Sequence, residues 1–313
     1  MRVLIVSFGI VPEPARQGVV FDNLLKALAP RYEVDALTIR EAEMPYVQRY
    51  RGARMLRVPV DGSHEERVSA FQRAVRRQIE GSDYDVIHVR DAAGALPVCE
   101  MKAYHGARVV FEVQAEQNLP DGGAADGSRR SDLAPRQLAC LERSDLALVR
   151  GREAAEIIQK VLPEVRVAQF PPAVDIDAFD WEPVFRRDGA DPSERRIVYV
   201  GNVAEGVGLE DLIDAMPIVL ESEPARLVIA GPPRGASWPR LSARARALGL
   251  ESRLELCQAI DHSDVARFLA GAAVAVVPHV AGGDLGGCPS KLLEYAACRL
   301  PIVAPRAAAV RSL

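Results

Sequence analysis

Cysteines, aromatic residues and long apolar runs are all scarce in this sequence. Five cysteines occur among 313 residues, and aromatic residues make up 5%. The cysteines form no Cys-x-x-Cys pair and no zinc-site spacing with one another or with histidine: Cys99, Cys140, Cys257, Cys288 and Cys298. This spacing argues against a disulfide scaffold and a zinc module, and we expect the reduced thiols of a cytosolic protein.

Membrane spans, a secretory signal and a basic surface are also missing. No stretch approaches the ~18 uninterrupted apolar residues that a membrane-spanning helix needs. Residues Met1–Phe8 enter an apolar strand directly, without the charged segment and long apolar region of a signal peptide. The chain contains 39 Lys and Arg and 43 Asp and Glu, which gives a net charge of −4 and a pI of about 5.8. We therefore expect a cytoplasmic protein with no nucleic-acid partner, because no basic field attracts one.

Short apolar runs alternate with helical patterns along the first half of the chain. Strands are expected at Val3–Val6, Val34–Leu37, Leu56–Val60, Asp85–Val89, Val109–Val113 and Leu146–Val149. Helices are expected at Val20–Leu28, His64–Ile79, Ala93–His105, Asp132–Arg143 and Glu153–Val161. Strands that are apolar on both faces and alternate with helices predict a parallel sheet covered by helices.

This alternation breaks at Phe170-Pro171-Pro172 and restarts after Arg195. The intervening segment is rich in Asp, Pro and Gly, which predicts an irregular linker. Further strands are then expected at Ile197–Val200, Leu227–Ala230, Leu254–Leu256, Val274–Val277 and Ile302–Ala304, and helices at Leu209–Leu220, Trp238–Leu248, Ser263–Leu269 and Lys291–Ala297. The sequence thus predicts a domain over residues 1–170, a linker over 171–195 and a second domain over 196–313.

Both predicted domains have the same α/β architecture, a Rossmann-like parallel sheet, without being a sequence repeat. In an open parallel sheet the ligand sits beyond the carboxyl ends of the strands, where helix N-termini point. Two such domains facing each other would form a cleft. That geometry suits a nucleotide diphosphate held by one domain and its reaction partner held by the other.

The segment Gly282–Pro305 is the most informative part of the sequence, because a glycine-rich loop leads into a helix and then an apolar strand. Ser290 can cap the first N–H groups of that helix, and with Lys291 close by these groups form an anion site ready for phosphates. Glu294 lies one turn further along. Its carboxylate can accept two hydrogen bonds from adjacent hydroxyls, such as those of a ribose.

The simpler interpretation of this segment is a capped helix whose Lys291 and Glu294 face water. The glycines before the cap favour the other interpretation, because glycine lets a ligand approach the backbone closely. Four of them precede Ser290, namely Gly282, Gly283, Gly286 and Gly287.

Gly282–Pro305 resembles the donor-binding motif of family-4 (group 1) retaining glycosyltransferases, which have the two-domain GT-B fold. In that family the motif has two glutamates separated by seven residues, and Glu294 matches the second, which binds the ribose. Ser290 and Lys291 match positions whose backbone N–H groups bind the donor phosphate. The first glutamate, which binds hydroxyls of the donor sugar, is replaced here by Gly286.

Weaker matches follow the family's order and spacing over nearly the whole chain. Gly18 stands where the family has a glycine-containing loop after its first strand. Tyr199–Asn202 resembles the first turn of the donor domain, where an Arg and a downstream Lys often bind the diphosphate; here these positions are Asn202 and Val207. The resemblance as a whole implies donor binding by Gly18, Asn202, Gly286, Gly287, Ser290, Lys291 and Glu294.

The resemblance implies a retaining glycosyltransferase that acts on a nucleotide-sugar donor and a sugar, lipid-linked or small-molecule acceptor. It implies no cofactor, since the nucleotide sugar is a substrate. No metal site is expected either, because no Asp-x-Asp pair lies in a position that indicates one. Relatives continue with further elements after the strand matching Ile302–Ala304, so we expect the second domain to be incomplete at Leu313.

Other interpretations stay open at this point. A non-catalytic nucleotide-sugar-binding relative is favoured by Gly286, Asn202 and Val207. A nucleotide-sugar epimerase would need converging acid and base groups, and we find no convincing set. An NAD-dependent dehydrogenase is disfavoured, because no Gly-x-Gly-x-x-Gly follows the first strand.

Two further features allow a functional and a structural interpretation. His88 ends a strand and can border a pocket, although a structural histidine is the more common case. The helix His64–Glu80 is amphipathic and carries Arg73, Arg76 and Arg77. Such a helix can make weak peripheral membrane contact, whereas packing on its own sheet is the simpler expectation.

Overall fold

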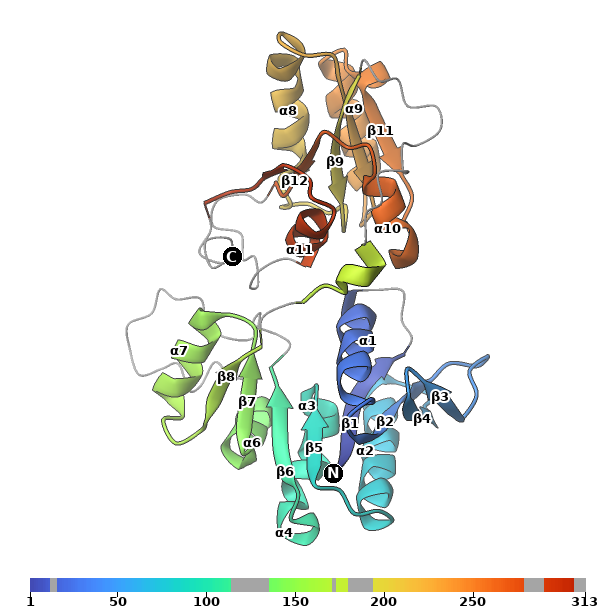
Figure 1. The fold of residues 1–313 in the computed structure, drawn as a ribbon, viewed down its shortest axis with the longest axis vertical. Coiled ribbons are helices and arrows are strands. Elements are labelled where there is room, and N and C mark those ends of the chain that lie inside the picture. Colours follow the sequence, from blue (N-terminus) through green and yellow to red (C-terminus); the bar gives the residue numbers. More distant parts are fainter. Residues whose placement is uncertain (12–15, 114–134, 171–172, 180–193, 279–289, 307–313) are drawn as a thin grey trace. The chain divides into compact units, whose positions relative to one another are not determined.

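The computed structural model of the protein describes residues 1–11, 16–113, 135–170, 173–179, 194–278 and 290–306. The chain forms two compact units, Met1–Pro171 and Pro172–Leu313 (Figure 1). Each unit is an α/β domain with its own mainly parallel sheet, which confirms the predicted fold class.

The first unit contains an eight-stranded sheet in the order β3-β4-β2-β1-β5-β6-β7-β8. Its strands are β1 (Arg2–Ile10), β2 (Glu33–Arg40), β3 (Val47–Tyr50), β4 (Ala53–Pro59), β5 (Val86–Val89), β6 (Arg108–Glu112), β7 (Leu146–Val149) and β8 (Val167–Gln169). Neighbouring strands pair in parallel, except that β3 and β4 form an antiparallel hairpin at one edge.

Helices cover both faces of this sheet. Those described are α1 (Arg16–Leu28), α2 (His64–Glu80), α3 (Ala92–Glu100), α4 (Lys102–His105), α6 (Pro135–Arg143) and α7 (Arg152–Val161). Residues of β1 alternate between two apolar clusters: Val3 and Ile5 lie with Phe21 of α1, whereas Leu4 and Val6 lie with Phe71 of α2. Consecutive strand residues point to opposite faces, so a strand between two helical layers must be apolar on both.

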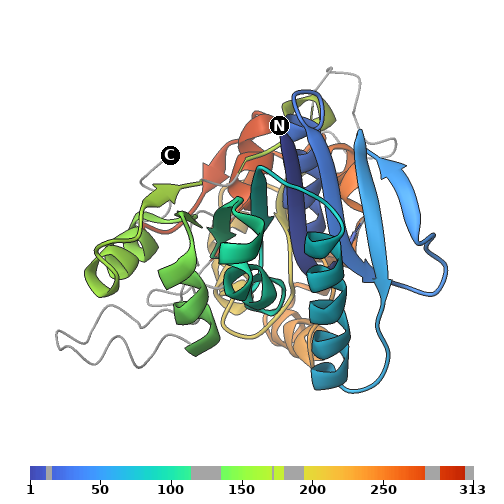
Figure 2. The same ribbon diagram turned by 90° about the horizontal axis from the view of Figure 1, so that it is seen from below.

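Helix α2 runs along one face of the sheet (Figure 2). A capping box begins it, in which Glu66 N donates to Ser63 Oγ at 3.3 Å and Ser63 N donates to Glu66 Oε2 at 2.7 Å. Its apolar stripe is buried against the sheet, namely Val68, Phe71, Val75 and Ile79. The stripe therefore belongs to the core, and the solvated face of α2 is polar. None of the described helices combines the length and apolarity of a membrane span.

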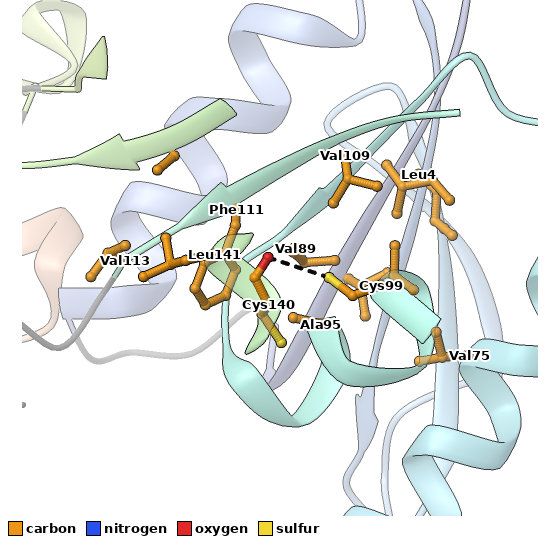
Figure 3. Close-up of a cluster of buried hydrophobic side chains, with 14 of the residues drawn as sticks. Leu4, Val75, Val89, Ala95, Cys99, Val109, Phe111, Val113, Cys140 and Leu141 are labelled. Carbon is orange, nitrogen blue, oxygen red and sulfur yellow. Dashed lines mark hydrogen bonds between the residues drawn. The ribbon is translucent and has the colours of Figure 1, made fainter. Parts of the chain in front are cut away.

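The apolar cluster that contains the stripe of α2 extends to α3 and α6, where two cysteines are buried (Figure 3). The Cys99 thiol lies 3.6 Å from the carbonyl oxygen of Cys140. Both are free thiols, as are Cys257 and Cys298 of the second unit.

The second unit contains a five-stranded parallel sheet in the order β11-β10-β9-β12-β13. Its strands are β9 (Arg195–Val200), β10 (Ala225–Ala230), β11 (Leu254–Cys257), β12 (Val274–Val276) and β13 (Ile302–Val303). Its described helices are α8 (Leu209–Leu220), α9 (Ser237–Ala247), α10 (His262–Leu269) and α11 (Ser290–Ala297), with 3₁₀ turns η2 (Ile176–Phe179) and η3 (Glu251–Arg253). One apolar cluster joins the sheet to α8 and α9, and another joins it to α10, α11 and η2.

Three local features differ from the sequence-based expectation. The helix expected over Ala93–His105 is divided at Met101 into α3 and α4. The edge strands β3 and β8 were not predicted, because β3 is largely exposed and β8 is only three residues long. Within the expected linker, Ile176–Phe179 forms the turn η2, and Phe179 is 1% exposed in the core of the second unit, with its ring 5.6 Å from that of His262.

Candidate functional site

Two glycines lie at the carboxyl ends of adjacent strands in the second unit. Gly201 follows β9 and Gly231 follows β10, with φ angles of 151° and 149° that favour glycine. A Cβ atom on Gly231 would lie 1.8 Å from the carbonyl oxygen of Gly201, so no larger residue fits without a backbone shift. A Cβ atom on Gly201 would lie 2.7 Å from Nζ of Lys291. The glycine at the end of β9 therefore lets Lys291 approach the backbone closely.

Tyr199 holds Lys291 at this strand end. The Lys291 ammonium lies 4.3 Å from the centre of the Tyr199 ring and donates a hydrogen bond to its hydroxyl at 3.0 Å. The hydroxyl in turn donates to the carbonyl oxygen of Asn202 at 2.8 Å. The ring is 1% exposed. A cation over a buried ring is attracted by the negative face of the π system, so the ring fixes the position of the ammonium group.

Tyr295 fixes the helix that carries Lys291. Its hydroxyl, in the core of the unit, accepts a hydrogen bond from the backbone N–H of Val200 at 2.8 Å. Burial raises the pKa of Tyr295. Because Val200 is the last residue of β9, this bond ties the first turns of α11 to the strand end where Gly201 lies.

The structure places Ser290, Lys291 and Glu294 on α11, all half-buried. Lys291 and Glu294 are three residues apart, so their side chains lie on one side of the helix. The Asn202 side chain is exposed, and its carbonyl oxygen belongs to the Lys291–Tyr199 chain of hydrogen bonds. Val207 packs against the apolar cluster of α8 and α9.

The other predicted donor residues lie in the first unit or outside the described residues. Gly18 lies in the first turn of α1, in the first unit, where a glycine-containing loop was expected. Gly286 and Gly287 lie outside the described residues.

A second group of polar side chains lies at the carboxyl ends of β5, β6 and β7 in the first unit. Glu112 is 1% exposed and lies between three basic groups. Arg90 Nε donates to its Oε2 at 2.9 Å, and His88 Nε2 lies 3.3 Å from the same oxygen. Arg150 Nη2 lies 3.7 Å from its Oε1. We call these four residues, His88, Arg90, Glu112 and Arg150, the Glu112 cluster.

Charge keeps Glu112 ionised in spite of its burial. Burial alone would raise the pKa of this carboxyl, but the contact with His88 and the charge and hydrogen bond of Arg90 outweigh it, so the pKa lies well below its usual range. His88 is buried against this carboxylate, but its Nε2 makes no hydrogen bond among the described residues. The neighbouring Asp91 caps α3 by accepting from Gly94 N at 2.7 Å, and burial raises its pKa despite this bond.

The partners of Lys291 and Arg90 were not identified from the sequence. Tyr199 precedes Lys291 by 92 residues and Glu112 follows Arg90 by 22. The sequence contained one indication of the second contact. Arg90 and Glu112 both lie at the ends of apolar strands, and the polar groups of a parallel sheet lie at the carboxyl ends of its strands. No group of three or more His, Cys, Asp or Glu side chains suited to a metal ion occurs within the described part of the chain.

Comparisons with known proteins agree in family and fold. The structure resembles sucrose-phosphate synthase from Thermosynechococcus elongatus with a TM-score of 0.76 and 19% identity, over 97% of this chain and 80% of that one. It resembles Anabaena HepE, solved in complex with UDP and glucose, with a TM-score of 0.73 and 13% identity, over 100% of this chain and 82% of that one. At these identities the likeness shows the fold, which is that of GT-B glycosyltransferases.

Sequence comparisons extend from the fold to the family. The chain is 26% identical over 262 residues to "Uncharacterized glycosyltransferase MJ1607" of Methanocaldococcus jannaschii, and the match covers 80% of this chain and 66% of that protein. Residues 194–313 match the family model "Glycosyl transferases group 1". Residues 17–173, half of the chain, match the model "Glycosyl transferase 4-like domain". The chain belongs to the group 1, family-4-like glycosyltransferases.

Proposed function

We propose that this protein transfers a sugar from a nucleotide-diphosphate sugar to an acceptor with retention of configuration. The observation that carries the proposal is the position of Lys291 against Gly201, at the carboxyl end of β9 and the start of α11. Family membership supports the reaction class. The structures of HepE with UDP and with UDP-glucose support a nucleotide-sugar donor for a protein of this fold.

Lys291 and the helix start act on the leaving group. As the bond between the sugar and the diphosphate breaks, negative charge develops on the diphosphate oxygens. The N–H groups of the first turn of α11 and the Lys291 ammonium are donors for this charge. Glu294, three residues further along, accepts hydrogen bonds from the ribose hydroxyls. The acceptor, a sugar or a lipid-linked or small molecule, binds to the first unit.

A second candidate function is nucleotide-sugar binding without transfer. It is favoured by two positions at which the family often has cations. Asn202 is uncharged and exposed, and Val207 is half-buried and packs against the apolar cluster of α8 and α9. Turnover of the donor distinguishes the two functions, because a binding protein retains affinity for the nucleotide sugar but releases no nucleoside diphosphate.

The experiment that tests the donor site compares nucleotides with and without phosphates. A thermal-shift screen of UDP, GDP and ADP sugars identifies the donor, because a ligand that binds the folded state raises its stability. Lys291→Ala should then weaken binding of the matching nucleoside diphosphate by about 1.5–3 kcal/mol, the scale of a hydrogen bond to a charged group. Binding of the nucleoside without phosphates should change much less.

A matched control variant is Arg267→Ala, which removes an exposed cation from α10 of the same unit. It should leave both affinities unchanged. Equal losses for the nucleoside and its diphosphate in Lys291→Ala, measured by calorimetry, would disprove the phosphate role of this residue.

A further inference from the structure

Two thiols lie together in the core of the first unit, on helices that pack against each other (Figure 3). Cys99 of α3 is 3% exposed, and Cys140 of α6 is fully buried. The Cys99 thiol donates to the carbonyl oxygen of Cys140 at 3.6 Å, across 41 positions of the chain. The sulfur atom of Cys99 therefore contacts the residue that carries the second thiol. Neither cysteine belongs to the proposed donor site.

The two thiols differ in acidity, because each shifts the pKa of the other. The contact with Cys140, together with the charges of Arg143 and Lys102, lowers the pKa of Cys99 in spite of its burial. The contact with Cys99 and burial raise the pKa of Cys140. The thiolate is the reactive form of a cysteine, so Cys99 is the nucleophile of the pair and Cys140 remains a thiol beside it.

Cys99 lies in a part of α3 that opens at low cost. It is in the last turn of the helix, which ends at the cap Met101. Pro97, inside the same helix, has no N–H to donate, and the carbonyl oxygen of Ala93 accepts from the Gln72 side chain at 3.1 Å instead. Helix ends open locally with a smaller free energy than global unfolding requires. A small oxidant therefore reaches Cys99 while the rest of the unit stays folded.

We propose that Cys99 and Cys140 form a reversible disulfide when the protein meets hydrogen peroxide. The Cys99 thiolate attacks one peroxide oxygen, the O–O bond breaks and hydroxide leaves, so the sulfur becomes a sulfenic acid. The Cys140 sulfur then attacks the Cys99 sulfur, the S–S bond forms and water leaves with the Cys140 proton. The hydroxide takes up the proton that Cys99 lost on ionisation. Two thiols are thus oxidised by two electrons, and one peroxide is reduced to two waters.

The disulfide would change the local stability of the first unit. It joins α3 to α6 and restricts the opened chain more than the folded one, because it spans 41 positions. Opening of α3 away from α6 then becomes rarer. Helix α3 begins at its cap Asp91, two residues after β5 ends. The redox state of the pair therefore sets how firmly the helix that follows this strand end is held.

The test exposes the folded full chain to hydrogen peroxide, blocks the remaining thiols by alkylation and maps the peptides by mass spectrometry. We expect the peptides of Cys99 and Cys140 joined by a disulfide that dithiothreitol reverses. In Cys140→Ser, Cys99 should stop at the sulfenic acid, which dimedone traps. Cys140→Ala repeats the trapping without a buried hydroxyl, in case the serine variant does not fold. Cys257→Ser is the control, because it removes a half-buried thiol of the second unit and should leave the disulfide unchanged.

Hydrogen exchange gives the second readout. Peptides that cover α3 should exchange at least about tenfold more slowly in the oxidised protein than in the reduced protein, and peptides of the second unit should not change. The proposal is wrong if Cys257 is oxidised while Cys99 and Cys140 stay reduced, or if Cys99 proceeds to the sulfinic acid beside a reduced Cys140. A disulfide that forms only in denaturant, or one that leaves exchange in α3 unchanged, would also overturn it.

Discussion

The two units hold a cation at the carboxyl ends of their strands with different main partners, although both cations lie near an aromatic ring. Arg90 is 5.0 Å from the centre of the Phe21 ring, and Lys291 is 4.3 Å from that of Tyr199. In the first unit Arg90 is 2% exposed and bonded to a carboxylate, Glu112, whose pKa is held low. In the second unit Lys291 is half-buried and lies over the ring of Tyr199. A buried ion pair fixes local structure, and removal of one partner leaves an uncompensated charge. The face of an aromatic ring attracts an ammonium group and so helps to orient it.

The Glu112 cluster and the residues around Lys291 should have different roles. The Glu112 cluster should contribute mainly to the stability of the first unit, whereas the Lys291 group should contribute mainly to ligand affinity in the second. Mutations at the two places should therefore separate stability from binding.

The largest effect is expected for Glu112→Gln. The substitution removes the carboxylate that Arg90 and Arg150 contact, and breaking a buried ion pair from one side typically costs about 3–5 kcal/mol of unfolding free energy. Hydrogen exchange should show the loss in peptides that cover β5 and β6. Glu156→Gln, at an exposed pair with Arg152, is the control and should cost less than about 1 kcal/mol. Unchanged protection in Glu112→Gln would show that the cluster is not structural.

Glu294→Gln should lower ligand affinity and leave stability nearly unchanged. The loss of up to two charge-assisted hydrogen bonds to the ribose corresponds to about 2–4 kcal/mol, or a roughly 30- to 1000-fold lower affinity for the nucleotide sugar. The melting temperature should hardly change, because the substitution is nearly isosteric. Glu251→Gln, at an exposed position of the same unit, is the control. A large fall in melting temperature with unchanged donor affinity would identify Glu294 as structural and end the donor assignment.

The pH dependence of stability should also separate the units. The pKa of Glu112 is lower in the folded than in the unfolded state, so its ionisation stabilises the first unit at neutral pH. This contribution is present above the unfolded pKa of about 4.3 and is lost as the pH falls below it, by up to about 1.4 kcal/mol per pH unit. Asp91 acts in the opposite sense, because its pKa is raised.

The difference between the unaltered protein and Glu112→Gln cancels the contribution of Asp91. This difference in unfolding free energy should be largest near neutral pH and shrink steadily between about pH 5 and pH 3. Denaturant titrations across that range measure it. If the difference in unfolding free energy stayed constant with pH, the ion pairs would not lower the pKa of Glu112.

The sequence predicted the helices and strands of each unit better than the side-chain contacts that join those elements within a unit. Runs such as Val3–Val6 are apolar on both faces because helices cover both, and this requirement is visible in one dimension. The spacing of Lys291 and Glu294 was equally visible, because a helix relates residues three apart. The contact of Lys291 with Tyr199 depends on how α11 packs on β9, and that of Arg90 with Glu112 on the register of β5 and β6. Neither follows from local pattern, since both join residues that are distant in sequence.

The smallest effect concerns how Tyr199 orients Lys291. Tyr199→Phe removes the hydroxyl that accepts from Lys291 at 3.0 Å but keeps the ring, and should weaken nucleoside-diphosphate binding by about 0.5–1.5 kcal/mol. Tyr199→Leu removes the ring as well and should cost roughly a further 0.5–1 kcal/mol. The order of affinities should be Tyr, then Phe, then Leu. Calorimetry with the nucleoside alone is the control, because a ligand without phosphates does not need the ammonium group. Equal losses for both ligands would mean that Tyr199 supports the fold of the second unit rather than the position of Lys291.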